Sequence, residues 1–374
     1  MRYHRRSVIA AGLSGLAMSM AHPGMAWASA ATDKKFIFIL QRGAADGLAT
    51  VAPTGDRDFL SARGNFAEEA LTGRKLDDLF TLHPAMVETA GLFEQKQASF
   101  VHALASGYRE RSHFDAQNVM ESGAMQPYGR DDGWMNRLLS LLPADSAKAL
   151  AVAPSVPLIL RGPAPASSYE KSRGNGPDED LMQRVAMLYA EDPALSSLWQ
   201  DAVETDAMAA VQQGKMRGGA AVGSMAAGLM NGPAGARVLM LETNGWDTHS
   251  RQKGRLGNQL KQADALIAAL RDGLGEDWNN TLVLVATEFG RTVAFNGTGG
   301  TDHGTGSAAM LFGGALKNGG TVKADWPGLA AASLFENRDL RPTMRFEDIV
   351  TDALSDHYAI DPVQMKRTLF PNFV

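Results

Sequence analysis

Short apolar runs separated by polar, glycine-rich segments are the main pattern along the chain after residue 33. They lie at 34–41 (KKFIFILQ), 98–106 (ASFVHALAS), 236–243 (ARVLMLET) and 280–290 (NTLVLVATEFG), with further strand-like sequence around 150–160. Each run is rich in aliphatic, β-branched or aromatic residues and ends at a polar or glycine-containing turn, which is typical of buried strands. The chain therefore has several strands that lie far apart in sequence.

Helical signals fall between these runs. Within 255–274 most apolar residues lie on one helical face, which predicts an amphipathic helix between two strands. Residues 112–123 (SHFDAQNVMESG) begin at a serine suited to N-capping and end at a glycine, as a helix does. Strand, helix and strand at this spacing predict an α/β fold with a mostly parallel sheet and helices on both faces.

A Pro-, Ser- and Gly-rich stretch at 161–180 interrupts this pattern. A Met- and Ala-rich segment at about 181–230 follows it and is predicted to be helical. We expect one domain, 31–374, with a helical insertion at about 178–232. Its position between strands suggests a lid or a peripheral element.

The first 30 residues have a basic head, an apolar middle of small residues and an Ala-x-Ala end. Arg5 and Arg6 before this mild apolar core indicate a twin-arginine signal peptide, cleaved near Ala28–Ala30, and a periplasmic location. The leader contains three arginines and no acidic residue. Its removal lowers the count of Lys and Arg from 36 to 33, against 41 Asp and Glu, so the mature chain has a net charge near −8. An acidic chain without a basic arm disfavours nucleic acid, and a broken apolar leader disfavours stable membrane insertion.

The chain has no cysteine. Disulfides, thiolate metal sites and cysteine nucleophiles are therefore excluded. Any metal site must be built from carboxylates, imidazoles and hydroxyls, which suit zinc, manganese, magnesium or calcium.

Polar residues follow the predicted strands, where ligands bind in parallel sheets. Four different strands are followed by Asp46, by Ser112 and His113, by Asp247 and His249, and by Glu288, and Asp302 and His303 lie in a glycine-rich loop before another strand-like run. We expect them to converge on one or two divalent metal ions, and two ions would hold the attacking and leaving oxygens of an ester.

Structural interpretations remain open for several of these residues. Asp46 is also a good turn residue, Asp247 and Ser112 are also good helix caps, and Glu288 is three residues from Arg291, with which it would form an ion pair. Arg291 is alternatively a contact for a phosphate or sulfate group.

Ser112 has a catalytic interpretation too. It lies among Arg109, Arg111 and His113 at a predicted helix N-terminus, where an anion is stabilised. A metal or a nearby base would activate its hydroxyl for attack on phosphorus or sulfur.

The ordered segments SHFDAQ, GWDTH, TEFGRT and DHG resemble the domain of unknown function 1501, a bacterial family of exported proteins. The resemblance covers the whole mature chain. The family is in turn similar to the alkaline-phosphatase-like superfamily, which includes sulfatases. This implies a three-layer α/β sandwich, two metal ions and a nucleophile at the start of a helix.

The resemblance also implies roles for individual residues. Asp46, Asp247, His249, Glu288 and His303 match metal-ligand positions, and Ser112 matches the nucleophile position. Phe289 departs from the pattern, because it stands where relatives have a histidine, so one metal site is expected to be incomplete. The lack of cysteine excludes a sulfatase with a modified cysteine.

These observations predict a periplasmic, metal-dependent hydrolase of a small-molecule or polymer-linked phosphate or sulfate ester. Ser112 is the predicted nucleophile, and Arg291 or Arg111 the predicted anion contact. One alternative is a catalytically inactive protein of the cell envelope that binds a metal or an exported partner protein. A phosphoryl-transfer mutase is a third hypothesis, which the exported location disfavours.

Overall fold

The computed structural model describes residues 33–143, 147–170, 192–211 and 218–373, together with positions 185, 188 and 189. The predicted signal peptide, with its twin-arginine pair and its cleavage region at Ala28–Ala30, lies outside the described residues. So does the first part of the predicted insertion, 178–184. Among the helices of the described ranges, none is long and apolar enough to cross a membrane.

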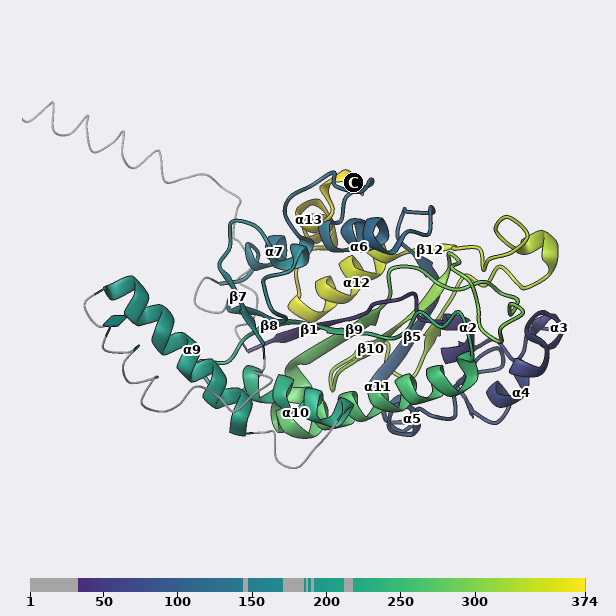
Figure 1. Ribbon diagram of the computed structural model, residues 1–374, viewed down its shortest axis with the longest axis horizontal. Coiled ribbons are helices and arrows are strands. Elements are labelled where there is room, and N and C mark those ends of the chain that lie inside the picture. Colours follow the sequence, from purple (N-terminus) through teal and green to yellow (C-terminus); the bar gives the residue numbers. More distant parts are fainter. Residues whose placement is uncertain are drawn as a thin grey trace, which may run out of the picture.

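A single large sheet runs through the centre of the protein, in the strand order β11-β5-β10-β9-β1-β8-β6-β7, with β12 also paired to β5 (Figure 1). β10 is antiparallel to both of its neighbours, and the other pairs are parallel, which confirms the predicted mostly parallel sheet. The strands are β1 (Lys35–Gln41), β5 (Ala98–Ala105), β6 (Ala149–Val152), β7 (Ala166–Tyr169), β8 (Val238–Thr243), β9 (Thr281–Ala286), β10 (Ser307–Phe312), β11 (Val322–Lys323) and β12 (Met344–Arg345).

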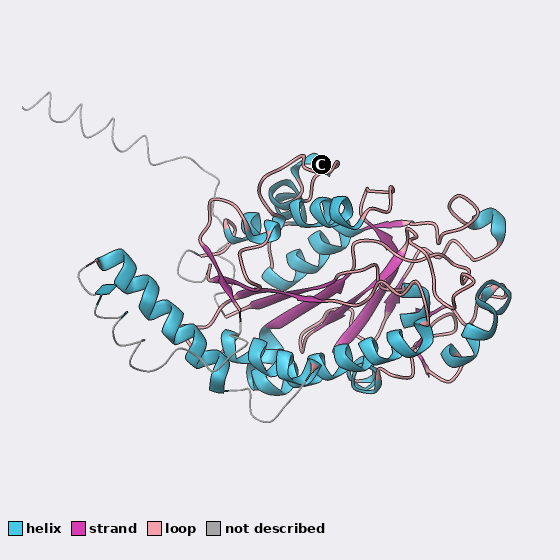
Figure 2. Cartoon of the chain, in the orientation of Figure 1, coloured by secondary structure: helices cyan, strands magenta, loops and turns pink. Residues whose placement is uncertain are grey.

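Helices cover both faces of this sheet and make the three layers visible in Figure 2. Alternate residues of β1 enter two separate cores: Ile37 and Ile39 pack on one side, Phe36 and Phe38 on the other. The first core is covered by α5 (Val87–Glu94), α10 (Gly219–Met230) and α11 (Gln252–Leu274), and the second by α6 (His113–Ser122), α7 (Trp134–Leu139), α12 (Phe346–Tyr358) and α13 (Pro362–Leu369). The continuous apolar strands of the sequence are thus buried on both faces.

Smaller elements lie beside the sheet. Three short strands form a second sheet in the order β2-β4-β3, and further helical turns connect the main elements. These are β2 (Val51–Ala52), β3 (Arg74–Lys75), β4 (Thr81–Leu82), α2 (Gly47–Thr50), α3 (Phe59–Arg63), α4 (Ala67–Ala70), and the 3-10 turns η1 (Gly64–Phe66), η3 (Leu158–Leu160), η4 (Gly275–Asn280), η5 (Ala331–Ser333) and η6 (Pro371–Phe373).

Two predicted segments differ in detail. The strand-like sequence around 150–160 forms a strand only to Val152, since Pro154 and Pro157 follow, and a 3-10 turn replaces the rest. In the predicted insertion, the described part contains α9 (Pro193–Val211), which extends from the domain in Figure 1, and α10.

The helix α10 belongs to the core. Gly223 lies so close to α11 that a Cβ atom there would stand 2.2 Å from the carbonyl oxygen of Leu266. Met225, Leu229 and Met230 are buried in the same core as Ile37. This last helix of the insertion therefore supports the sheet rather than forming a lid.

Candidate metal centre

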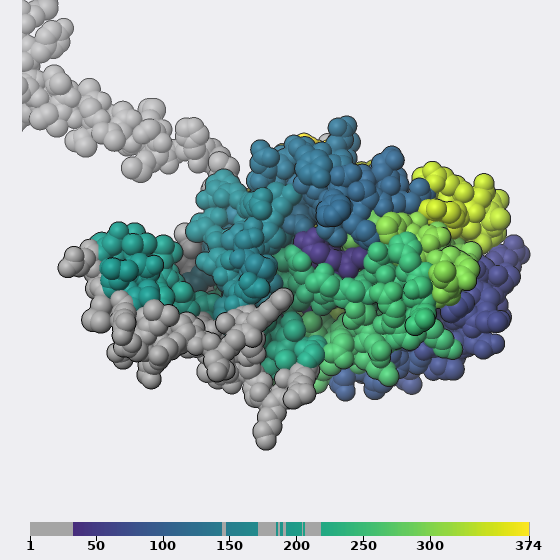
Figure 3. All heavy atoms as spheres, viewed as in Figure 1, coloured from purple at the N-terminus to yellow at the C-terminus, as the bar shows by residue number. Residues whose placement is uncertain are grey.

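Residues that follow the carboxyl ends of the parallel strands meet at one end of the sheet. His113 is the first residue of α6, after β5; Asp247 and His249 lie in the loop after β8; His303 lies in the loop before β10. On the face shown in Figure 3, purple atoms from the start of the described chain lie in a hollow between blue and green segments. The side chains of these four residues lie close together, and we call them the four-ligand cluster.

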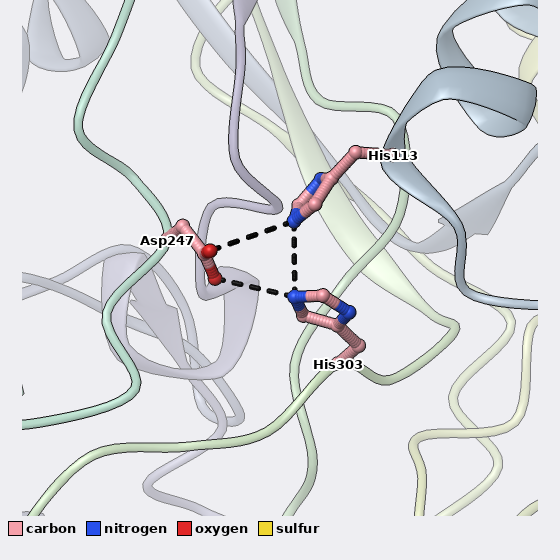
Figure 4. Close-up of side chains that lie close together, drawn as sticks. All are labelled: His113, Asp247 and His303. Carbon is pink, nitrogen blue, oxygen red and sulfur yellow. Dashed lines mark hydrogen bonds and ion pairs between the residues drawn. The ribbon is translucent and has the colours of Figure 1, made fainter.

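The side chains of this cluster approach one another closely. Nε2 of His303 lies 2.9 Å from Nε2 of His113 and 3.0 Å from Nε2 of His249. Oδ1 of Asp247 lies 3.2 Å from His303 Nε2 and 3.0 Å from His249 Nε2. Figure 4 shows the inward orientation of His113, Asp247 and His303, whose ligand atoms lie within 4.8 Å of one another.

Each imidazole is held through its other nitrogen. His113 Nδ1 lies 2.8 Å from Glu288 Oε1, and His303 Nδ1 lies 3.1 Å from the backbone carbonyl of Arg111. His249 Nδ1 lies 3.2 Å from Oδ1 of Asp302. Because these partners are acceptors, each neutral imidazole is assigned a proton on Nδ1 and a lone pair on Nε2.

The Nε2 lone pairs of His113 and His303 and a carboxylate oxygen of Asp247 thus lie together, an arrangement that a cation stabilises, and His249 Nε2 adjoins His303 and Asp247 at the edge of this group. Carboxylate or carbonyl acceptors behind ligand histidines are a recurrent feature of metal sites. A tetrahedral zinc ion with bonds of about 2.0–2.1 Å separates its nitrogen ligands by about 3.3 Å, so a small outward shift of these atoms makes room for it. The residues of the four-ligand cluster therefore fit a divalent metal ion.

Arg291 donates to the same oxygen of Asp247 that adjoins His249 and His303: its Nη1 lies 2.6 Å from Asp247 Oδ1. Arg291 is buried and also donates to the hydroxyl and carbonyl oxygens of Thr301. Burial raises the pKa of Asp247, but Arg291 together with His249 and His303 outweighs it and holds the pKa below its ordinary value. Asp247 is thus a carboxylate at neutral pH, while its side chain remains 44% exposed.

The structure places Glu288, a predicted direct ligand, behind His113 on the side of Nδ1. Its Oε1 accepts hydrogen bonds from His113, from Gln117 Nε2 at 2.9 Å and from the backbone N–H of Gly43 at 2.9 Å. Burial raises the pKa of Glu288, but these hydrogen bonds have the larger effect and hold the pKa below its ordinary value. The buried carboxylate therefore stays ionised. The hydrogen bond to Glu288 is also the main reason why the pKa of His113 is raised.

A glycine is needed at position 43 for this contact. Gly43 has a φ of +116°, and a Cβ atom there would lie 2.6 Å from the backbone nitrogen of Asp247. The loop after β1 therefore passes directly beneath the four-ligand cluster.

Asp46, also a predicted metal ligand, lies outside the four-ligand cluster and is paired with other side chains. It caps α2, and its Oδ2 lies 2.5 Å from both Arg63 Nη2 and Gln252 Nε2 in a buried environment. Gln252 in turn accepts a hydrogen bond from the Thr301 hydroxyl, to which Arg291 donates. The carboxylate of Asp46 is neutralised by Arg63, and it reaches the cluster only through this chain of hydrogen bonds.

The remaining predicted catalytic residues lie at the edge of the cluster. The guanidinium of Arg111 pairs with Asp339 and Glu336, so only its backbone carbonyl reaches the histidines. Ser112 is the N-cap residue of α6, but its side chain makes no capping hydrogen bond. Its hydroxyl instead interacts with Tyr108.

His113 was among the polar residues expected to follow the strands, but the sequence did not assign it as a metal ligand. Its signal was its position, since an imidazole at the start of a helix that follows a parallel strand faces the same end of the sheet as the other candidates. Phe289, where the resemblance implied a histidine, stacks on His113 with ring centroids 4.9 Å apart. Within the described residues, the structure gathers one set of metal ligands rather than two.

A family model described as "Protein of unknown function (DUF1501)" matches residues 33–354. Similar solved structures include the lipoteichoic acid synthase LtaP from Listeria monocytogenes, at 10% identity over 78% of this chain and 69% of that chain, with a TM-score of 0.41. The C-terminal periplasmic domain of EcEptC from Escherichia coli, in a complex with Zn, is 8% identical over 78% and 75%, with a TM-score of 0.38. No curated protein sequence matches the chain.

Proposed function

The chain belongs to the DUF1501 family, and we propose from its four-ligand cluster that it is a metal-dependent hydrolase of a phosphate or sulfate ester. The observation that carries the proposal is the grouping of His113, Asp247 and His303, whose ligand atoms lie within 4.8 Å of one another, with His249 Nε2 3.0 Å from both Asp247 Oδ1 and His303 Nε2. A divalent ion bound there supplies Lewis-acid activation of an ester oxygen. Zinc suits these ligands best, and manganese is second.

Each residue around the ion has a defined task in this proposal. His113, His249, His303 and Asp247 hold the metal, and Arg291 keeps Asp247 ionised and oriented. The open side of the site is formed by Asp247 and His249, each with a side chain about 45% exposed, where an ester can approach. The substrate is a small-molecule or polymer-linked ester, met in the periplasm after export and removal of the signal peptide.

Ser112 is the proposed nucleophile, because it directly precedes His113 and keeps its hydroxyl free of the helix backbone. Attack by its Oγ forms a covalent ester at phosphorus or sulfur and releases the substrate alcohol, and water then hydrolyses the enzyme ester. Replacement of Ser112 by alanine should abolish turnover while the metal content is unchanged. Turnover that persists in Ser112→Ala assigns the attack to water instead.

Metal analysis is the first experiment. The chain 31–374, purified without chelator, should contain about one equivalent of metal, and Asp247→Asn with His303→Ala should contain almost none. Asp272→Asn, an exposed carboxylate paired with Arg271, is the matched control and should keep the metal. A metal-free protein that ignores added zinc, manganese, magnesium and calcium contradicts the proposal.

Turnover is the second experiment. Aryl phosphate monoesters, phosphate diesters and sulfate esters are assayed with each metal ion, with the Asp247→Asn variant as the blank. Metal-dependent hydrolysis that disappears in the variant supports the hydrolase.

A metal-binding protein without catalysis is the second candidate function. Two ion pairs favour it. Asp46, a predicted metal ligand, pairs with Arg63, and Arg111, a predicted anion contact, pairs with Asp339. Stoichiometric metal without turnover of any ester selects this alternative, with an exported protein as the expected partner.

A further inference from the structure

A separate cavity lies at the opposite end of the sheet from the four-ligand cluster. Its volume is about 370 Å³, and it is lined by Lys34 before β1, by Ser99 near the start of β5 and by Thr281 at the start of β9. The metal ligands follow the other ends of the strands, so the length of the sheet separates the two sites. A cavity of this volume accommodates a small organic ligand.

The inner surface of the cavity is apolar. Val101, Leu282 and Leu311 form its floor on the sheet, and Ile349 and Ala353 of α12 form the facing wall. An aliphatic or aromatic group that fills this space gains about 25 cal/mol for each Å² of apolar surface removed from water.

Two exposed ion pairs border the mouth. Lys323 Nζ lies 3.1 Å from Asp352 Oδ2, and Lys317 pairs with Asp356 one helical turn further along α12. Exposed pairs of this kind contribute at most about 1 kcal/mol, so they can open when a ligand enters. With both aspartates paired, Lys34 is the cation of the lining that has no ion-pair partner in the described ranges.

Two polar atoms in the wall are also without partners. The hydroxyl of Ser355, in a residue that is 5% exposed, and Nε2 of His357 are buried and make no hydrogen bond to any described residue. Burial, with Lys34 nearby, lowers the pKa of His357 to about 3, so its ring is neutral. Because both atoms have almost no accessible surface, they lie behind the lining and are not contacts for a molecule in the cavity.

We propose that this cavity binds a small amphipathic anion. Its apolar body lies against Val101, Leu282 and Leu311, and its acidic group pairs with Lys34. Three lysines against two aspartates in the lining disfavour a cation. The proposal does not depend on the chemistry of the four-ligand cluster.

Binding is tested with the fluorescent anion 8-anilinonaphthalene-1-sulfonate on the metal-loaded chain 31–374, with octanoate and uncharged 1-octanol as competitors. We expect one saturable site, from which octanoate displaces the dye at a concentration at least fivefold lower than octanol. Dye binding that does not saturate, or equal competition by octanol and octanoate, overturns the proposal.

Variants locate the site. Lys34→Gln should weaken octanoate binding about five- to tenfold and leave octanol unchanged, whereas Lys75→Gln, an exposed lysine of β3, should change neither. Ala353→Trp should fill the cavity and abolish saturable dye binding, and Ala194→Trp on exposed α9 is its control. If Ala353→Trp does not fold, the Lys34→Gln result decides alone. Undiminished octanoate binding in Lys34→Gln contradicts the proposal.

Discussion

Single hydrogen bonds decide which histidines of this protein can hold a metal. His113, His249 and His303 each direct Nδ1 to an acceptor and Nε2 to the cluster. His102, by contrast, is fully buried, and its Nε2 contacts backbone carbonyls of Gly47 and Val51 while burial lowers its pKa to about 4. The same residue type thus serves two purposes, and the partner of each ring nitrogen distinguishes them.

Glu288 should therefore affect the affinity for the metal through its hydrogen bond with His113. In Glu288→Gln the amide is a weaker acceptor for Nδ1, so we expect the affinity for zinc to fall about 10- to 100-fold without being lost. Competition with a fluorescent zinc chelator measures this change. Glu94→Gln, at an exposed surface ion pair, is the control and should bind zinc normally. Complete loss of zinc from Glu288→Gln would show instead that Glu288 is itself a ligand.

Glu347, near the start of α12, should make stability depend on pH. Both of its carboxylate oxygens are buried without a hydrogen bond to any described residue, and burial raises its pKa from 4.5 to about 7. The folded state therefore binds this proton more tightly than the unfolded state does. The resulting contribution to the free energy of unfolding is complete below pH 4.5 and is lost as the pH rises through 7. The loss between pH 5 and 8 is about 2–3 kcal/mol.

Urea unfolding at pH 5 and pH 8 measures this effect. Glu347→Gln should lack that part of the pH dependence, so its stability relative to the wild type should improve by about 2–3 kcal/mol at pH 8. Glu276→Gln, an exposed carboxyl group, should follow the wild type at both pH values. Parallel pH curves for wild type and Glu347→Gln contradict the prediction.

At the scale of elements, α6 carries a metal ligand at one end and a specific stop at the other. Gly123 ends the helix with a φ of +64°, and its backbone N–H bonds to the carbonyl of Val119. A Cβ atom at this glycine would lie 2.8 Å from Phe370. Glycine is therefore required both by the backbone conformation and by the packing of the C-terminal segment.

Gly123→Ala should destabilise the protein by about 1–3 kcal/mol, because alanine is strained at positive φ and its methyl group displaces Phe370. Gly91→Ala in α5 is the matched control: nothing lies within 4 Å of the added Cβ, so helix propensity should stabilise it by up to about 1 kcal/mol. Thermal or urea unfolding compares the two. Equal effects of the two substitutions would refute this account of the α6 terminus.

The elements themselves were largely predictable. The strands at 34–41, 98–106 and 280–290 and the helices at 112–123 and 255–274 appear close to their predicted limits, because apolar runs, caps and glycine stops act locally. The predicted strand around 150–160 was too long, and α10 is a core helix rather than a lid. Burial of α10 depends on α11, which no local pattern of 219–230 reveals.

At the scale of the whole molecule, the proposed metal site connects segments that are distant in sequence. The four ligands come from α6, the loop after β8 and the loop before β10. A metal that binds only the folded state stabilises it by RT ln(1 + [L]/Kd), which is about 3–4 kcal/mol at 100 to 1,000 times Kd. Removal of the metal should therefore loosen the entire domain rather than one loop.

Chelation tests this coupling. EDTA should lower the Tm of the zinc-loaded protein, and added zinc should restore it. The Tm of the Asp247→Asn variant should not change on addition of EDTA or of zinc. An unchanged Tm after verified removal of the metal contradicts the coupling.

The sequence by itself determined the fold class, the position of polar candidates just after the strands and the absence of cysteine ligands, because these follow from local periodicity and residue type. It also identified Asp247, His249 and His303 as candidates that the structure brings together. The tertiary structure decided which candidates face the cluster. Asp46 pairs with Arg63 and Glu288 pairs with His113, whereas His113 itself lies with Asp247 and His303 in the candidate metal site. These partners lie up to 175 residues apart, and side-chain pairing at such separation is set by sheet order and packing, which local sequence does not encode.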